Sequence, residues 1–221
     1  MSLSIYVGYD ERERVGYHVC ASSILRRTSL DVAFHPVRGQ KVVGSTQFNP
    51  GRFDIARRNG YRGWALWCEA DMLFRADVEE LLAYADPRFD VLVVPHDYRT
   101  KFATKFLGQP NPDYPRKNQS SLMLVNCMGA AWQRLAEGKR EGGAYRPWTL
   151  EELHRFEFIE PGRIGALPPE WNHLILECDP NPAAKICHFT VGLPVWPEYA
   201  HCEFADEWRA EREAMLSYAG A

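Results

Sequence analysis

Two carboxylates interrupt one of the most hydrophobic stretches of the sequence. Glu69 and Asp71 follow the apolar run "GWALWC" (63–68), and apolar residues resume at Met72. Because a buried carboxylate without a partner costs several kcal/mol, acids in such a setting are paired with cations or bound to metal. In extended backbone, residues two apart share one side of the chain, so both carboxylates can face one cation. The spacing therefore indicates a site for Mg²⁺ or Mn²⁺, which bind carboxylate and phosphate oxygens.

Simpler interpretations of the two acids stay open. They can pair with arginines, or Asp71 can accept backbone hydrogen bonds in the turn after a strand. An acid-x-acid triplet is by itself a weak signal. Its position strengthens it, because ligands of open α/β sheets bind at the carboxyl ends of the strands.

Strand and helix patterns alternate around these acids. We predict strands at 3–9, 31–37, 63–70, 89–96, 120–127 and 183–189. Helices are predicted at 11–28, 51–58, 129–140 and 150–158, with another beginning at Asp77 and a C-terminal amphipathic helix at 203–218 that Gly220 closes. This alternation favours an α/β fold with a mostly parallel central sheet flanked by helices.

Composition excludes several classes of protein. The 221 residues, of which 46% are hydrophobic and 25% charged, suit one globular domain covering 1–221. A net charge of −3 does not favour nucleic acid or an anionic membrane as partner. No apolar stretch reaches the roughly 20 residues that span a bilayer. The six cysteines form no C-x-x-C pair, and no secretory hydrophobic segment begins the chain, so we expect free thiols and a cytoplasmic location.

Six short segments are spread over residues 5–199, namely "IYVGYDERE", "STQFNPGRF", "GWALWCEADMLFRAD", "KNQSSLMLVNC", "LPPEWNHL" and "KICHFTVGLPVW". In this order they resemble the segments of glycosyltransferase family 8, especially those of its small bacterial members. The resemblance implies a single GT-A domain, a nucleotide-diphosphate-sugar donor, a divalent metal (usually Mn²⁺, otherwise Mg²⁺) and transfer with retention at the anomeric carbon.

The resemblance also implies roles for individual residues. Asp71 matches the second aspartate of the metal motif, Glu69 takes the place of the first, and His188 matches a late histidine ligand. Taken alone, His188 in "KICHF" is better explained as a core histidine that donates to a backbone carbonyl. The remaining matches are a nucleotide loop with Tyr9 and Asp10, a nucleotide-binding arginine at Arg52, and donor-sugar contacts at Asn118, Gln119 and Ser120, with Glu152 or His154 on the far side of the sugar.

Three features depart from the family pattern. The first motif acid is a glutamate, the acidic/amide triplet at the far side of the sugar is not clearly present, and "HFTVGLPVW" lacks the lysine that normally faces the diphosphate. The long segment 97–119 supplies other cations, namely Lys101, Lys105, Arg116 and Lys117. Its length predicts a lid that brings Lys101, Lys105 or Lys117 over the diphosphate, although an ordinary solvated loop is equally polar.

The sequence thus predicts a metal-dependent retaining glycosyltransferase with a UDP-sugar donor and a carbohydrate or glycoconjugate acceptor. Two alternatives stay open. One is a metal-dependent phosphohydrolase or nucleotidyltransferase that uses Glu69, Asp71 and His188. The other is a non-catalytic module that binds a nucleotide sugar.

Overall fold

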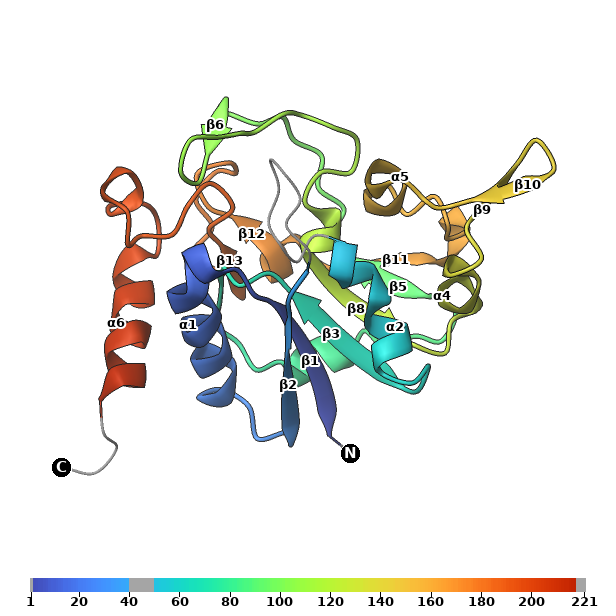
Figure 1. Ribbon diagram of the computed structural model, residues 1–221. Coiled ribbons are helices and arrows are strands. Elements are labelled where there is room, and N and C mark those ends of the chain that lie inside the picture. The colour runs from blue at the N-terminus through green and yellow to red at the C-terminus, as the bar shows by residue number, and fades with distance from the viewer. Residues whose placement is uncertain (1, 40–49, 218–221) are drawn as a thin grey trace.

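A six-stranded sheet forms the centre of the computed structural model, which describes residues 2–39 and 50–217. The strands follow the order β11-β5-β8-β3-β1-β2 (Figure 1). Their bounds are β1 Leu3–Gly8, β2 Val32–Val37, β3 Trp64–Cys68, β5 Val91–Val93, β8 Leu122–Asn126 and β11 Ile164–Ala166. Only β8 runs against its neighbours β3 and β5, and the other pairs are parallel. The mostly parallel sheet is as predicted.

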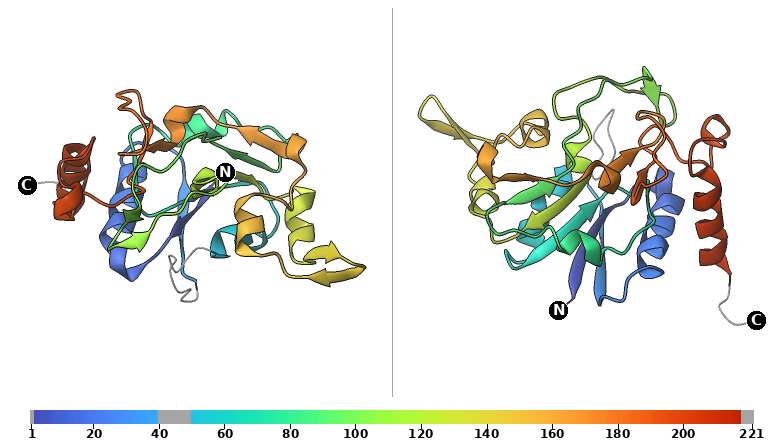
Figure 2. Two further views of the ribbon diagram at one scale, coloured as in Figure 1. Left: turned by 90° about the horizontal axis from the view of Figure 1, so that it is seen from above. Right: turned by 180° about the vertical axis from the view of Figure 1, so that it is seen from behind.

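Helices cover both faces of this sheet, as a parallel sheet requires. Seen from above, α1 (Arg14–Leu25) and α6 (Ala205–Leu216) lie on one side, and α2 (Ile55–Arg58) and α4 (Ala130–Leu135) on the other (Figure 2). Alternate residues of β3 supply the two cores. Leu66 packs in the core beneath α1, whereas Trp67 packs with the residues of α2 and α4.

A second, three-stranded sheet determines where the late histidine lies. Its order is β12-β13-β4, formed by His173–Leu174, Ile186–His188 and Met72–Phe74. β4 pairs antiparallel with β13 and places His188 opposite Met72. Because β4 follows directly on Asp71, the pairing brings a histidine from the end of the chain beside the two acids.

Short helical segments complete the fold. The α-helices among them are α3 (Glu79–Leu82) and α5 (Leu150–His154), and the 3₁₀ helices are η1 (Glu11–Glu13), η2 (Pro50–Asp54), η3 (Gln119–Ser121), η4 (Pro161–Arg163), η5 (Pro169–Asn172) and η6 (Pro197–Tyr199). No helix of the described residues has the length and apolar character that crossing a membrane requires. The six cysteines, all within the described ranges, are free.

Several boundaries differ from the prediction. The strand predicted at 63–70 ends at Cys68, so Glu69 and Asp71 lie in a turn. The helix predicted at 11–28 is η1 followed by α1, and that predicted at 51–58 is η2 followed by the single turn of α2. The C-terminal helix is shorter than 203–218, and Gly220 lies outside the described residues.

The helix predicted at 129–140 is also wrong in its second half. It ends at Leu135, and a hairpin of β9 (Lys139–Glu141) and β10 (Ala144–Arg146) follows. Gly142 and Gly143 both have positive φ, at 58° and 87°. Two such residues form the tight turn that suits a two-residue hairpin, which explains why the chain leaves the helix here.

The segment 97–119 contains a small hairpin that the sequence did not predict. It consists of β6 (Thr104–Lys105) and β7 (Gln109–Pro110). The segment passes above the edge of the central sheet where β1 and β3 end (Figure 1). Its position matches that of a cover over the ends of these strands.

Candidate functional site

Glu69, Asp71 and His188 converge on one small space. Each of them offers one atom to a group whose members all lie within 4.8 Å of one another. The distances from His188 Nε2 are 3.3 Å to Glu69 Oε2 and 3.4 Å to Asp71 Oδ1. The imidazole is fully buried, and the carboxylates are 16% and 14% exposed. The expected convergence of these three side chains is therefore observed.

Neighbouring backbone holds the two acids in place. The Glu69 amide donates to Ser121 O at 3.1 Å, just before β8, and the Phe189 amide donates to Asp71 O at 2.9 Å, just after β13. Because β8 is antiparallel to β3, the residues that precede β8 reach the same sheet edge as those that follow β3. Three segments distant in the sequence thus meet at this turn.

The orientation of His188 leaves one ring nitrogen facing the acids. Its Nδ1 lies 2.9 Å from Asn172 Oδ1. Because Asn172 Nδ2 donates to Ser121 Oγ at 2.9 Å, its Oδ1 is an acceptor, and Nδ1 of the histidine is the donor. In the neutral ring, this contact selects the tautomer in which Nε2 carries the lone pair, the form in which histidines bind metals.

The polar atoms in this space contact one another at long range. His188 Nε2 and Asp71 Oδ1 are buried, and within the described residues neither makes a hydrogen bond of good geometry, although they lie 3.4 Å apart. Burial by itself lowers the pKa of His188, but the carboxylates of Asp71 and Glu69 outweigh it and raise that pKa to about 9. Two carboxylate oxygens and an imidazole nitrogen, each turned toward one point, fit a divalent cation such as Mn²⁺.

Glu69 has a second partner. Its Oε1 lies 2.5 Å from Nη2 of Arg52, a buried arginine. Burial favours a higher pKa for Glu69, but Arg52 and His188 hold the pKa of this carboxyl well below its usual range. One of the open alternatives, a pair with an arginine, therefore holds for Glu69 and leaves its second oxygen directed at His188.

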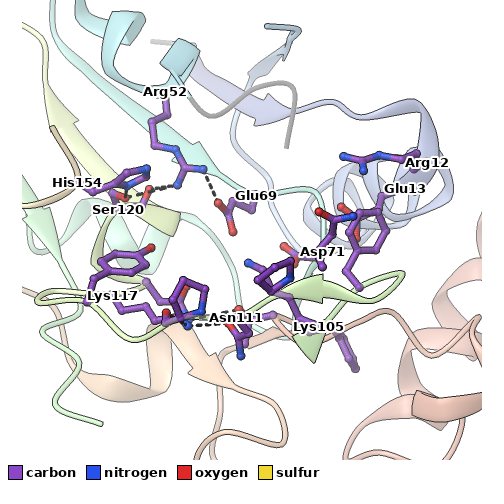
Figure 3. A pocket seen from close by; sticks show the side chains of 18 residues that line it. Arg12, Glu13, Arg52, Glu69, Asp71, Lys105, Asn111, Lys117, Ser120 and His154 are labelled. Carbon is purple, nitrogen blue, oxygen red and sulfur yellow. Dashed lines mark hydrogen bonds and ion pairs between the residues drawn. The ribbon is translucent and has the colours of Figure 1, made fainter. Parts of the chain in front are cut away.

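A cavity of about 190 Å³ adjoins the three residues. Glu13, Glu69 and Asp71 lie along one part of its wall, and Lys105, Asn111 and Lys117 lie across from them (Figure 3). The other lining residues are Arg12, Arg52, Phe106, Gln109, Pro110, Pro112, Tyr114, Asn118, Ser120, His154, Phe189 and Thr190. An acidic wall that faces a basic wall suits a cation and a polyanion bound side by side.

Glu13 was not among the predicted site residues. It is 5% exposed and lines the cavity, and its carboxylate has no hydrogen bond or ion pair to any residue in the described ranges. Burial, together with the negative charges of Asp71, Asp10 and Glu69, raises its pKa well above the usual value. In the sequence, Glu13 stands in "DERER", a pattern typical of a solvated helix start, so nothing distinguished it.

The three lysines of the 97–119 segment lie in different environments. Lys105 lines the cavity, whereas Lys101 is exposed, with its Nζ 3.8 Å from an oxygen of Asp179. Lys117 is 6% exposed and donates to Asn111 Oδ1 at 2.6 Å and to Pro112 O at 2.8 Å. Burial and the nearby Lys105 cation lower the pKa of Lys117 to about 8.

Some of the residues matched to the donor sugar line the cavity and others do not. Asn118, Ser120 and His154 line the cavity, whereas Gln119 is not among the lining residues of the described chain. Nδ1 of His154 lies 2.7 Å from Ser120 Oγ. Burial and the Arg52 cation lower the pKa of His154 to about 3. Glu152 lies away from the cavity and accepts hydrogen bonds from Lys139 and Arg146.

The residues matched to the nucleotide loop lie at the end of β1. The guanidinium of Arg38 stacks 4.4 Å from the Tyr9 ring. The Asp10 carboxylate is fully buried and accepts from the Arg12 side chain at 2.6 Å and 2.9 Å. In the described part of the chain, neither Tyr9 nor Asp10 lines the cavity, whereas Arg12 and Arg52 do.

A comparison of sequences supplies a relative. Protein CDI of Arabidopsis thaliana is 36% identical over 230 residues, in an alignment that covers 95% of this chain and 85% of the plant protein. This chain belongs to the family of Protein CDI. No family model matches it.

Solved structures show which fold this member of the CDI family has. The bifunctional glycosyltransferase WbbM superimposes with a TM-score of 0.64 at 13% identity, over 96% of this chain and 49% of WbbM. GlyE of Streptococcus pneumoniae TIGR4 gives 0.63 at 12% identity, over 98% and 62%. The galactosyltransferase LgtC, solved with donor and acceptor sugar analogs, gives 0.61 at 10% identity, over 98% of both chains.

These likenesses establish the fold. This chain spans about half the length of WbbM and less than two thirds of GlyE, but nearly all of LgtC. At identities of 10% to 13%, a shared architecture is what the superpositions demonstrate. The protein has the GT-A fold of these glycosyltransferases, as predicted.

Proposed function

We propose that the protein is a metal-dependent glycosyltransferase, related to glycosyltransferase family 8, that moves a sugar from a UDP-sugar to a carbohydrate or glycoconjugate acceptor with retention at the anomeric carbon. The described residues form the catalytic domain. The observation that carries the proposal is the cavity at the carboxyl ends of β1 and β3, where Glu69 and Asp71, with His188 buried against them, lie across from Lys105 and Lys117. The GT-A fold supports the same reaction class.

The chemical difficulty of sugar transfer is the departure of a nucleoside diphosphate. Glu69, Asp71 and His188 would hold Mn²⁺ or Mg²⁺, which would stabilise as a Lewis acid the negative charge that develops on the diphosphate. Lys105 and Lys117 would add positive charge from the other side of the cavity and so take the part of the lysine that "HFTVGLPVW" lacks. Removing one preorganised stabiliser of this kind typically costs about 3–4 kcal/mol of barrier.

The donor sugar would lie between His154 and Asn118. Asn118 has a left-handed backbone with φ of 61°, and its Nδ2 donates to Tyr98 Oη at 2.7 Å. A neutral, half-buried His154 offers a hydrogen-bonding ring nitrogen to a sugar hydroxyl without introducing a charge. A uridine base fits the proposal at Tyr9, whose ring lies at the end of β1. Equal affinity for purine and pyrimidine diphosphates would contradict the choice of uridine.

The products of a turnover assay test this proposal. We would incubate the protein with UDP-sugars, Mn²⁺ and a panel of carbohydrate acceptors, and identify the nucleotide released. A glycosyltransferase breaks the bond between sugar and phosphate, so UDP should appear, faster with acceptor and not in the presence of a chelator. Release of UMP with sugar 1-phosphate would show a phosphohydrolase instead. Binding without any product would show a module that only binds the nucleotide sugar.

A further inference from the structure

The two carboxylate oxygens of Glu69 have different partners. Oε1 lies 2.5 Å from Arg52 Nη2, and Oε2 lies 3.3 Å from His188 Nε2. Oε2 is therefore the oxygen that points toward His188. With one oxygen paired to a guanidinium, a carboxylate can offer a cation one oxygen rather than two. The geometry of this site therefore depends on what fixes Oε1.

Arg52 is itself held firmly. Its side chain is 4% exposed, and Nη1 donates to the backbone oxygen of Ser120 at 2.9 Å. The same oxygen accepts from Trp67 Nε1 at 3.1 Å, and the guanidinium carbon lies 5.3 Å from the centre of the Trp67 ring. A planar guanidinium that contacts a ring and two oxygens has little freedom left, so it can fix the direction of a partner carboxylate.

The length of the Glu69 side chain explains why the contact with Arg52 would matter for binding a cation. Glutamate has one more rotatable bond than aspartate, so a free glutamate in a turn has more orientations in which it misses the cation. The pair with Arg52 selects one of them. An aspartate at position 69 would be shorter by one methylene and would not reach both Arg52 and the space in front of His188.

We propose that Arg52 is a positioning residue of the cation site: it binds Glu69 Oε1 and thereby presents Oε2 as a single-oxygen ligand. This inference rests on the proposed function in one respect, namely that Glu69, Asp71 and His188 hold a divalent cation. It assigns to Arg52 a role through Glu69, in place of the direct nucleotide contact that the sequence resemblance implies.

A charge-preserving substitution tests the proposal with Mn²⁺ alone. Arg52→Lys keeps the positive charge, so electrostatic repulsion of the cation stays nearly constant, but a lysine lacks the planar pair of Nη donors that bind Ser120 O and Glu69 Oε1 in fixed directions. We expect the Kd for Mn²⁺, measured by electron paramagnetic resonance of the free ion, to rise about tenfold. Arg57→Lys is the matched control, because Arg57 forms a similar pair with Asp54 outside the cavity, at 2.6 Å, and should leave the Kd unchanged.

A double-mutant cycle separates the two roles of Arg52. In a Glu69→Gln background, Arg52→Lys should cause no further loss of Mn²⁺ affinity. An equal loss in that background would overturn the proposal, since Arg52 would then act other than through Glu69. If Arg52→Lys does not fold, Glu69→Asp serves instead: it should weaken Mn²⁺ binding about tenfold, although it restores the family's aspartate. An undiminished affinity of Glu69→Asp would overturn the proposal.

The outcome also distinguishes this inference from the function on which it rests. If the unaltered protein does not bind Mn²⁺, the cation site is wrong and the role of Arg52 falls with it. If the unaltered protein binds Mn²⁺ and Arg52→Lys binds it with the same Kd, only the positioning role is wrong.

Discussion

Glu13, Glu69 and Asp71 place three carboxyl groups along one wall of a small cavity. Arg52 offsets the charge of Glu69, and His188 lies against Asp71, but Glu13 has no such partner in the described chain. Such an arrangement is unfavourable by itself, and the cation that we propose would offset it. Functional sites commonly store destabilisation of this kind.

We predict that Glu13→Gln stabilises the protein in the absence of metal. Glutamine has nearly the same shape and is neutral at every pH, so the substitution removes the cost that burial and the nearby carboxylates of Asp71, Asp10 and Glu69 impose on ionised Glu13, the same cost that raises its pKa. A gain of about 1 kcal/mol corresponds to a rise in Tm of about 2–4 °C for a chain of this size. Calorimetry in the presence of a chelator measures it. A lower Tm would mean that Glu13 has a structural partner.

The lowered pKa of His154 predicts how the free energy of unfolding depends on pH. The folded protein holds its pKa at about 3, below the ordinary 6.5, so between these values the unfolded chain carries a proton that the folded protein excludes. The free energy of unfolding therefore falls as the pH drops below 6.5, by up to about 1.4 kcal/mol per unit from this residue. His154→Gln should flatten that slope in urea unfolding between pH 7 and 5. An unchanged slope would show that His154 titrates normally.

At the scale of elements, the β6–β7 hairpin and the residues around it place Lys105 and Lys117 in the wall of the cavity. Lys105 ends β6, while Lys117 is anchored through Asn111, whose Nδ2 donates to Phe102 O and to the buried Glu177. The Glu177 carboxylate also accepts from the Lys101 amide at 2.7 Å. These contacts hold the segment down over the sheet edge. The cavity of about 190 Å³ is smaller than the pockets that usually hold ligands of this size, so we predict that the hairpin would shift to admit a UDP-sugar.

We predict that the lysines of this segment contribute unequally to donor binding. Lys105→Ala and Lys117→Ala each remove a cation that faces the cavity and should weaken UDP-sugar binding about tenfold or more, since a hydrogen bond to a charged group contributes about 1.5–3 kcal/mol. Lys101→Ala removes an exposed cation near Asp179 and should bind donor like the unaltered protein. Calorimetric titration distinguishes these cases. If all three variants bind donor as tightly as the unaltered protein does, the segment is an ordinary solvated loop.

At the scale of the whole molecule, the sequence predicted what depends on local pattern. Strand and helix alternation predicted the sheet and both helical layers, and the apolar run before Glu69 correctly indicated a buried strand, which ends at the candidate site. The resemblance to a known family was needed to connect His188 with Asp71. Their proximity depends on the pairing of β4 with β13, two strands of three residues each that leave no periodic pattern.

Other features could not be predicted from the sequence, because they depend on contacts between distant residues or on competing local patterns. The Arg52–Glu69 pair joins residues 17 apart across a turn, and no local rule predicts such a pairing. Gly142–Gly143 was a hairpin signal that a helical pattern at 129–140 concealed. The different fates of Lys101, Lys105 and Lys117 depend on how one segment packs against Glu177, which is distant in the sequence.

The central claim is that Glu69, Asp71 and His188 hold a divalent cation that the nucleotide-sugar donor requires. Thermal unfolding of the unaltered protein and of Asp71→Asn, each with UDP-sugar in the presence and absence of Mn²⁺, tests it most directly, because a ligand that binds the folded state raises Tm. We predict that donor raises the Tm of the unaltered protein only when Mn²⁺ is present, and beyond the rise that Mn²⁺ causes alone, whereas donor with Mn²⁺ causes no rise for Asp71→Asn. The same rise without Mn²⁺, or an undiminished rise in Asp71→Asn, would contradict the account.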